Sequence, residues 1–247
     1  MTQSILELNL KQLRLYIFLK NYALFAKDAI ANNQPYENYL KALTEEELIV
    51  RDKNRIKKLT SIANFPFLKY LSDFKFIELP NLNAKEILNL AECGYIDRHE
   101  NICLLGQTGT GKTHLAIGLG IEACKKKYSV LFYTASDLVN SLIEARSEYK
   151  LSKLQKKLAR ANLVIIDELG YLPLSKEGGE LLFQFFANRY EKGSIIITSN
   201  LEFGDWTKFM GDLTMTSALL DRLTHHCHIH TLNGESFRFK QSMKKRG

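Results

Sequence analysis

Apolar residues follow a helical period over the first part of the chain. Leu13 and Ile17 stand four positions apart, and similar spacings recur further along. Thr44 is followed by three glutamates, which favours a helix start because the positive end of the helix dipole stabilises acidic side chains. Pro66 predicts the end of this region, since proline disfavours helical geometry in the residue before it. We therefore expect a helical N-terminal domain over residues 1–70.

The pattern changes after about residue 75, where short apolar runs alternate with helical stretches. The runs that predict strands are 101–105, 130–133, 163–166 and 195–198. The stretches that predict helices are 112–125, 136–160 and 177–191. Continuous apolar strands are typical of a parallel sheet that is buried on both faces. Residues 71–247 therefore predict an α/β domain in which helices cover both faces of a parallel sheet.

Composition is that of an ordinary globular protein, with 45% hydrophobic and 25% charged residues among 247. The four cysteines lack zinc-ligand spacing, so we expect reduced thiols and a cytoplasmic location. The longest apolar run near the N-terminus, residues 15–19, is too short for a secretory signal. No run approaches the length of a membrane span, so we expect no membrane partner.

A glycine-rich loop between a predicted strand and a predicted helix matches the pattern G-x-x-x-x-G-K-T. Its residues are Gly106, Gln107, Thr108, Gly109, Thr110, Gly111, Lys112 and Thr113, with His114 directly after. The glycines allow backbone dihedrals that turn successive N–H groups toward phosphates. The lysine would contact the terminal phosphates, the threonine hydroxyl would bind Mg²⁺, and the helix dipole would add positive potential. The loop therefore predicts a nucleoside triphosphate site with Mg²⁺.

Two acids follow the third predicted strand, and a polar pair ends the fourth. Asp167 is expected to hold Mg²⁺, and Glu168 to orient and polarise the attacking water. A small-molecule kinase is the rival interpretation, but the second acid favours an ATPase. Asn200 is expected either to contact the γ-phosphate or the water, or to be an ordinary turn residue.

Arg222 lies in a predicted helix beside an aspartate. It is either one half of a surface ion pair or an arginine finger that acts on the nucleotide of a neighbouring subunit. Further on, His226, His228 and His230 would share one face of a strand. Because we expect no nearby carboxylate or further cysteine to complete a site, we favour a histidine-bearing strand over a metal site.

The chain carries a net charge of +7 and an isoelectric point of about 9.1, which favours a polyanionic partner. Two clusters hold many of the cations. The first comprises Arg51, Lys53, Arg55, Lys57 and Lys58, and the second Arg146, Lys150, Lys153, Lys156, Lys157 and Arg160. Solvated helix faces are the alternative, yet we expect both clusters to contact the DNA backbone. Neither contains a base-reading motif, so we expect recognition of phosphates or of DNA shape.

The sequence resembles the IstB-like ATP-binding proteins, helper ATPases of insertion-sequence transposases and relatives of DnaC-type helicase loaders in the AAA+ class. The resemblance extends from about Tyr39 to Phe239. The strings that carry it are Phe65–Pro66, Leu104–Thr113, Ile165–Leu174, Thr198–Leu201, Leu220–His226 and Gly234–Arg238. The segment from Asp167 to Leu174 is far more specific than a phosphate loop.

The resemblance implies roles for individual residues. Lys112 and Thr113 would bind nucleotide, and the two acids would serve Mg²⁺ and water. Asn200 corresponds to the first sensor, Arg222 to a trans-acting finger and Arg238 to the second sensor. The family further implies a homo-oligomer that forms with ATP on double-stranded DNA, prepares this target for a transposase and is reset by hydrolysis.

One departure concerns the C-terminal part. Only 47 residues follow Asn200, so we expect the full helical lid of many AAA+ proteins to be absent. Arg238 would then reach the nucleotide from a short tail. Two further functional hypotheses remain: a replicative helicase loader, and a non-enzymatic DNA scaffold that holds ATP as a long-lived ligand. The subunit number, the DNA geometry and the role of residues 1–38 are not determined by the sequence.

Overall fold

The computed structural model describes residues 4–234 and 236–237. The chain forms two compact units that divide after Lys58, whereas the sequence placed the change at about residue 70. One helix explains the difference. It runs unbroken to Ala63, and its last residues, Leu59 and Ala63, already pack in the core of the second unit.

The first unit is helical. Its helices are α1 (Ile5–Gln12), α2 (Tyr16–Ala31) and most of α3 (Tyr36–Ala63). The helix start expected at Thr44 is wrong, because Thr44 lies inside α3. The helix begins directly after Pro35, whose carbonyl accepts hydrogen bonds from the N–H groups of Asn38 and Tyr39.

A buried carboxylate joins the helices of this first unit. Glu47 is only 6% exposed, and it accepts a hydrogen bond from the N–H of Ile17 at 3.0 Å. Arg51 forms a 2.6 Å ion pair with the same carboxylate and donates to the carbonyl oxygen of Arg14 at 2.8 Å. Arg51, expected to contact DNA, therefore also holds α3 to the turn between α1 and α2.

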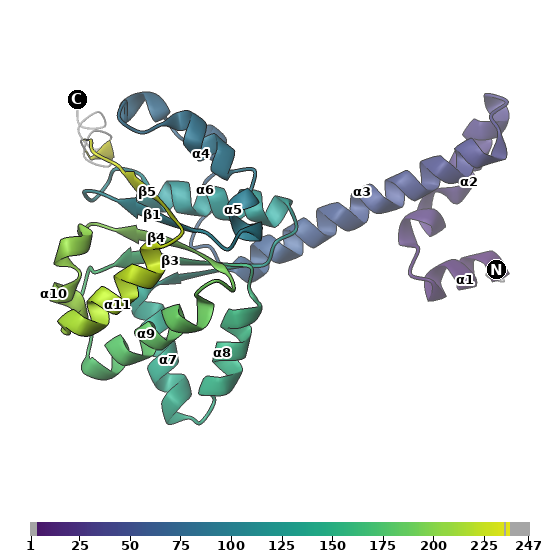
Figure 1. Ribbon diagram of the computed structural model, residues 1–247. Coiled ribbons are helices and arrows are strands. Elements are labelled where there is room, and N and C mark those ends of the chain that lie inside the picture. The colour runs from purple at the N-terminus through teal and green to yellow at the C-terminus, as the bar shows by residue number, and fades with distance from the viewer. Residues whose placement is uncertain (1–3, 235, 238–247) are drawn as a thin grey trace, which may run out of the picture. The chain divides into compact units, whose positions relative to one another are not determined.

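The second unit is an α/β domain (Figure 1). Its strands are β1 (Asn101–Leu105), β2 (Val130–Thr134), β3 (Leu163–Leu169), β4 (Ser194–Ser199) and β5 (Cys227–Thr231). Its helices are η1 (Leu71–Asp73), η2 (Phe76–Glu78), α4 (Ala84–Leu90), α5 (Gly94–Asp97), α6 (Lys112–Lys125), α7 (Ala135–Ser147), α8 (Leu151–Arg160), α9 (Lys176–Arg189), η3 (Phe203–Asp205), α10 (Thr207–Met210) and α11 (Leu213–Thr224). The strands pair in the order β2-β3-β4-β1-β5, and every pairing is parallel.

Alternate residues of each central strand enter two different cores. In β1, Ile102 and Leu104 pack with α4, α5 and α6, while Cys103 and Leu105 pack with the layer from α7 to α11. Figure 1 shows these two helical layers on opposite sides of the sheet. Since both faces are buried, every position of these strands can be apolar. The predicted parallel sheet with helices on both faces is confirmed.

Strand β3 is longer than its apolar run. The sequence predicted a strand that ends at Ile166, but β3 continues through both acids to Leu169. The register of β3 with β4 is irregular between Ile166 and Leu169. Asp167 and Glu168 are therefore held by a strand rather than by a free loop. Among the described residues, no helix combines the length and the apolar character needed to cross a membrane.

Candidate functional site

The glycine-rich loop connects β1 to α6 and needs glycine at defined positions. Gly106, Gly109 and Gly111 have φ values of 133°, 85° and 97°, which side-chain-bearing residues rarely adopt. A Cβ atom on Gly106 would stand 2.3 Å from the carbonyl oxygen of Leu232. Gly111 caps the N-terminus of α6, so the loop delivers the chain into a helix whose dipole favours anions.

Two side chains of the loop stabilise its curved backbone through hydrogen bonds. The Nζ atom of Lys112 donates to the carbonyl oxygens of Gly106 at 2.6 Å and Gln107 at 2.7 Å. The hydroxyl of Thr110 donates to the same Gln107 carbonyl at 2.8 Å. The loop therefore curls around an ammonium group at the entrance of α6.

Asp167 joins the end of β3 to the loop and to β4. The hydroxyl of Thr113 donates to its two carboxylate oxygens at 2.9 and 3.1 Å. The hydroxyl of Thr198 donates to Oδ1 at 2.5 Å. Asp167 is 4% exposed, so both hydroxyls meet a buried acid. A hydroxyl beside a carboxylate is a donor set that suits Mg²⁺.

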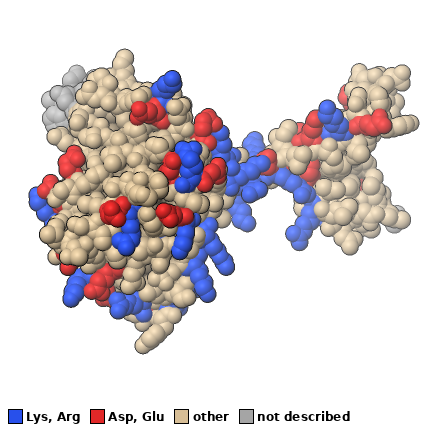
Figure 2. All heavy atoms as spheres, in the orientation of Figure 1, with Lys and Arg blue, Asp and Glu red and all other residues tan. Residues whose placement is uncertain are grey.

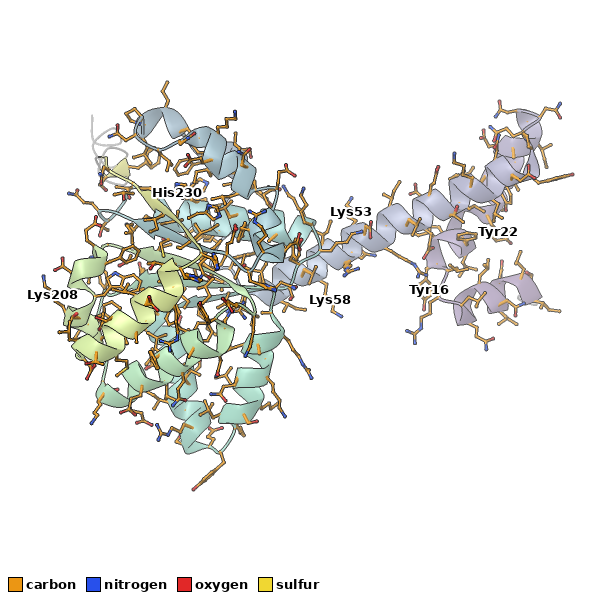
Figure 3. The ribbon with its side chains drawn as sticks, in the orientation of Figure 1. Tyr16, Tyr22, Lys53, Lys58, Lys208 and His230 are labelled. Atoms are coloured by element: carbon orange, nitrogen blue, oxygen red, sulfur yellow. The ribbon has the colours of Figure 1, made fainter. Side chains whose placement is uncertain are left out.

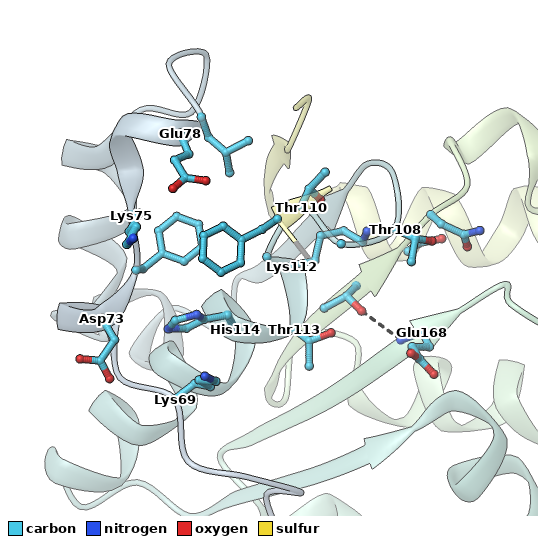
Figure 4. A pocket seen from close by; sticks show the side chains of 18 of the residues that line it. Lys69, Asp73, Lys75, Glu78, Thr108, Thr110, Lys112, Thr113, His114 and Glu168 are labelled. Carbon is cyan, nitrogen blue, oxygen red and sulfur yellow. Dashed lines mark hydrogen bonds between the residues drawn. The ribbon is translucent and has the colours of Figure 1, made fainter. Parts of the chain in front are cut away.

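Glu168 has the opposite environment from its neighbour. Its side chain is exposed, and its backbone lies in the left-handed region with φ of 60°. Its N–H donates to the hydroxyl of Thr198 at 2.9 Å, a contact drawn in Figure 4. Thr198 thus binds both acids at once. No local pattern predicted this role for Thr198, although the residue directly precedes Ser199 and Asn200.

A cavity of about 550 Å³ lies over these groups (Figure 4). The loop contributes residues 108–114 to its lining, and Glu168, Thr198 and Asn200 contribute from the strand ends. The structure therefore brings the predicted loop, the predicted water-activating acid and the predicted sensor to one cavity. Its volume falls within the range of small-molecule sites.

The opposite wall of the cavity was not predicted. It consists of Phe67, Lys69, Asp73, Phe74, Lys75, Glu78 and Leu79. His114 attaches this segment to α6, since its Nε2 atom lies 2.9 Å from the carbonyl oxygen of Tyr70 and its ring contacts Phe74 edge-on at 5.2 Å. The unusual density of aromatic residues between 65 and 76 was the signal that could have identified this wall.

The chain returns to the loop after β5. The N–H of Phe237 donates to the carbonyl oxygen of Gly109 at 3.0 Å, and the Phe237 ring lines the cavity beneath Nζ of Lys75. A Cβ atom on Gly109 would stand 2.2 Å from Oγ of Ser236. Arg238, the predicted second sensor, lies outside the described residues.

Arg222, the predicted finger, does not line this cavity. It is half-buried on α11, where Nη1 donates to the carbonyl oxygen of Ala218 at 2.7 Å. Its guanidinium carbon lies 5.4 Å from the centroid of the Phe183 ring on α9. The side chain is thus held on the helical layer by its own helix and by an aromatic face.

Of the three histidines expected on one strand face, His228 and His230 lie at alternate positions of β5, whereas His226 precedes the strand. His228 lies 2.8 Å from Glu100, and His230 is buried in the strand. The hydrogen bond from Arg98, with a further bond from His228, lowers the pKa of Glu100 to about 2.

A different group gathers beside them. Glu191, His225 and His226 have possible ligand atoms within 4.8 Å of one another. The expectation that no carboxylate stands near the histidines is therefore wrong, because the turn after α9 supplies one. All three side chains are exposed, an arrangement that is common without a metal.

The first basic cluster projects from more than one side of α3. Lys53, Arg55, Lys57 and Lys58 are all exposed. Lys53 and Lys58 point to different sides of the helix in Figure 3, and Figure 2 shows this part of the helix covered by cationic side chains. Asp52, Ile56 and Leu59 of the same stretch are half-buried, so the cations leave one side of the helix uncovered.

The second basic cluster lies on α7 and α8. Leu151, Leu154 and Leu158 pack against the core, while the six cations of this cluster are exposed. Lys157 lies 5.9 Å from the centroid of the Tyr133 ring. Helix α8 is therefore amphipathic, with an apolar face on the sheet layer and a basic face in solvent.

Known proteins resemble this chain over most of its length. The family described as IstB-like ATP binding protein matches residues 8–245. An insertion sequence IS5376 ATP-binding protein of Geobacillus stearothermophilus is 39% identical over 93% of this chain and 92% of its own length. An insertion sequence IS21 ATP-binding protein of Pseudomonas aeruginosa is 38% identical over 85% of this chain and 79% of its own length.

Solved structures show the same fold at lower identity. A DNA replication initiation factor has a TM-score of 0.58 and 23% identity, and it covers 72% of this chain and 55% of its own. The DnaC helicase loader has a TM-score of 0.54 and 21% identity, and it covers 69% of this chain and 97% of its own. These likenesses confirm the AAA+ fold. With the match over nearly its whole length, the chain belongs to the family of IstB-like ATP-binding proteins.

Proposed function

We propose that the protein is an Mg²⁺-dependent ATPase that assembles on double-stranded DNA and delivers this DNA to a transposase. One observation carries the catalytic part: Asp167, bonded to Thr113 and Thr198, lies at the end of the glycine-rich loop, while Glu168 opens into the same cavity. The buried acid, Asp167, is hydrogen-bonded to the hydroxyl of Thr113, a group of the kind that binds Mg²⁺ in such sites. The exposed acid, Glu168, is accessible to water.

In this proposal the loop holds the triphosphate. Its N–H groups and the ammonium of Lys112 would neutralise the phosphate oxygens, and Thr113 with Asp167 would hold Mg²⁺. The metal, when bound, supplies positive charge to the developing negative charge of the terminal phosphate. The wall from Phe67 to Leu79, with Phe237, gives the base and ribose an apolar place to pack.

The exposed carboxylate of Glu168 is the proposed base. It would accept a proton from the attacking water as the bond to the γ-phosphate forms. Asn200 lines the same cavity and would orient the water or the γ-phosphate through its side-chain amide. Arg238 stays a predicted second sensor.

Substitution of Lys112 tests ATP use directly. We expect Lys112→Ala to abolish DNA-stimulated release of phosphate, because the loop loses the cation that faces the terminal phosphates. Lys125→Ala is the matched control, since this lysine stands at the other end of the same helix in a surface pair with Glu122. Full activity in Lys112→Ala would contradict the proposed ATPase. Tight ATP binding by the unmodified chain, without turnover on DNA, would favour a scaffold instead.

The position of Arg222 supports action in trans. It does not line the cavity of its own subunit, so it would complete the site of a neighbour within a homo-oligomer. We expect Arg222→Ala to keep ATP binding and to lose hydrolysis. Mixing Arg222→Ala with Lys112→Ala chains should restore part of the activity. Some subunit boundaries then combine an intact Lys112 from one chain with an intact Arg222 from its neighbour. Hydrolysis at full rate by an isolated monomer would contradict this role.

The two basic clusters are the proposed DNA contacts, and the first unit, with the chain to about residue 70, is proposed to serve DNA binding and assembly. Affinity for a duplex should fall steeply with salt, since each neutralised phosphate releases counterions. Lys53→Gln combined with Lys57→Gln should reduce the slope of log affinity against log salt by about two. A flat salt response would contradict phosphate contacts.

The names of the relatives favour an insertion sequence as the setting, and hence a transposase as the partner. Capture of purified transposase and of purified replicative helicase by the immobilised protein would separate the two hypotheses. Binding of the transposase alone supports the proposal, and binding of the helicase alone would replace it with helicase loading. A cytoplasmic location stays a prediction.

A further inference from the structure

We propose that Tyr149, at the tip between α7 and α8, stacks on a nucleobase when the protein binds DNA. The proposal rests on the DNA-binding part of the proposed function and adds a base contact to what was otherwise expected to be phosphate recognition. The tip lies at the free end of the α7–α8 pair in Figure 1.

The backbone at this tip is a helix-ending turn that suits glycine. Helix α7 ends at Ser147 with Glu148 as its C-cap, and Tyr149 follows with φ of 58°. The N–H of Lys150 donates to the carbonyl oxygen of Ala145 at 2.7 Å, and that of Tyr149 donates to Arg146 at 3.2 Å. This is the hydrogen-bond pattern that most often has glycine at the left-handed position. The turn itself therefore gains nothing from a tyrosine.

The side chain also gains nothing from packing. Tyr149 is 98% exposed, so its ring contributes no buried apolar area to the fold. Among the described residues, nine besides glycines have positive φ, and Tyr149 has the largest side chain of these. A strained backbone and a solvated ring are two unfavourable features at one residue. Glycine would remove both, so the tyrosine has its use outside the folded monomer.

The surroundings of the ring indicate the kind of ligand. Arg146, Lys150 and Lys153 stand within four residues of it on both sides, and all are exposed. Lys150 pairs with Glu148 and Arg146 lies 3.6 Å from Glu177, but Lys153 makes no ion pair within the described part of the chain. An exposed aromatic ring among cations matches single nucleotides, because the ring stacks on the base while the cations meet the phosphates.

A protein partner would need a different surface. Docking sites for proteins have an apolar centre around their aromatic anchors. The residues that flank Tyr149 from Ser147 to Lys150 are all polar or charged and all exposed. The surplus of positive charge at the tip therefore favours a polyanion that displays aromatic faces.

Binding measurements with the full chain test the proposal. Fluorescence anisotropy would use a labelled duplex and one of its strands as probes, over a series of salt concentrations. Tyr149→Gly should raise the dissociation constant about 5- to 150-fold, which corresponds to about 1–3 kcal/mol per stacked base. The salt slope should stay unchanged, because the phosphate contacts remain. Tyr149→Phe should restore the affinity, since it keeps the ring.

Two controls separate stacking from a change in the fold. Tyr149→Gly should unfold at the same or a higher denaturant concentration than the unmodified chain, because glycine relieves the left-handed backbone. Leu88→Ala removes another large exposed apolar side chain, 53% exposed on α4 and outside both basic clusters, and should leave the affinity unchanged. Tyr149→Trp adds an exposed indole to a chain whose sole tryptophan, Trp206, is buried. DNA should quench this added emission.

Each outcome decides one point. If Tyr149→Gly loses more affinity for the single strand, the ring stacks on an unpaired base. If it loses more affinity for the duplex, the ring inserts between base pairs. Either result supports stacking. Unchanged affinity of Tyr149→Gly, with steep salt dependence retained, would overturn stacking and leave the proposed function intact. If the unmodified chain binds neither probe at low salt, the proposed function fails. Reduced self-association of Tyr149→Gly with unchanged DNA affinity would assign the ring to a second copy of the chain.

Discussion

The hydroxyl of Thr198 binds both the predicted Mg²⁺ acid and the predicted water-activating acid, so its removal should affect hydrolysis more than nucleotide binding. It donates to Asp167 at 2.5 Å and accepts from the N–H of Glu168 at 2.9 Å. Thr198 itself is 1% exposed, so water cannot replace either bond without rearrangement. Thr198→Val keeps the shape of the side chain and removes only its hydrogen bonding.

The two lost bonds set the magnitude. A hydrogen bond to a charged group contributes about 1.5–3 kcal/mol net and one between neutral groups about 0.5–1.5 kcal/mol. We therefore expect Thr198→Val to lower the free energy of unfolding by roughly 2–4 kcal/mol. If about 1.4–2.8 kcal/mol of this loss appears in the positioning of Glu168 for catalysis, kcat falls about 10- to 100-fold.

Denaturant unfolding followed by Trp206 fluorescence would measure the stability, since Trp206 is buried in the second unit. Steady-state phosphate release would give kcat, and nucleotide titration would give the affinity for ATP. Thr198→Ser is the matched control, because it keeps the hydroxyl, and it should retain most of both quantities. Unchanged stability and unchanged kcat in Thr198→Val would refute the idea that this hydroxyl positions the acids.

Three further predictions concern the framework. Arg189 is 3% exposed, and its guanidinium donates to four backbone carbonyls. Arg189→Met should therefore lower the free energy of unfolding by about 3–5 kcal/mol in a urea titration. A loss below about 1 kcal/mol would contradict this account. Gly106→Ala should abolish ATP binding in a titration, because its Cβ would meet the Leu232 carbonyl; full affinity would show that the loop can shift. Burial raises the pKa of the Cys93 thiol from 9.0 to about 12, so a thiol reagent should leave Cys93 of the native protein unlabelled at pH 8. The protonated thiol should contribute to stability below pH 9, and this contribution should be lost as the pH rises from about 9 to 12. Rapid labelling of the native protein would contradict the burial of Cys93.

The sequence alone determined the second domain in outline. Continuous apolar runs predicted buried parallel strands, because such strands have no polar face. The glycine-rich loop and Asp167–Glu168 could be placed at strand ends from the chain order. This works because the loop and the strand are local features, and each is specified by neighbouring residues.

The same local logic failed for α3. The glutamates after Thr44 favoured a helix start, yet Glu47 is used inside the helix to bind the backbone of α2. A long-range partner converted an apparent capping signal into an internal polar contact. No pattern of neighbouring residues could show that partner.

Only the tertiary structure decided how distant segments complete the site. Thr198 reaches both acids because β4 lies beside β3, and Phe237 reaches Gly109 because β5 lies beside β1. The aromatic wall from Phe67 to Leu79 joins them through His114. These contacts depend on strand order and on the packing of loops over strand ends. The sequence thus determined the local groups that are predicted to bind phosphate, and the fold decided which remote groups hold them in position.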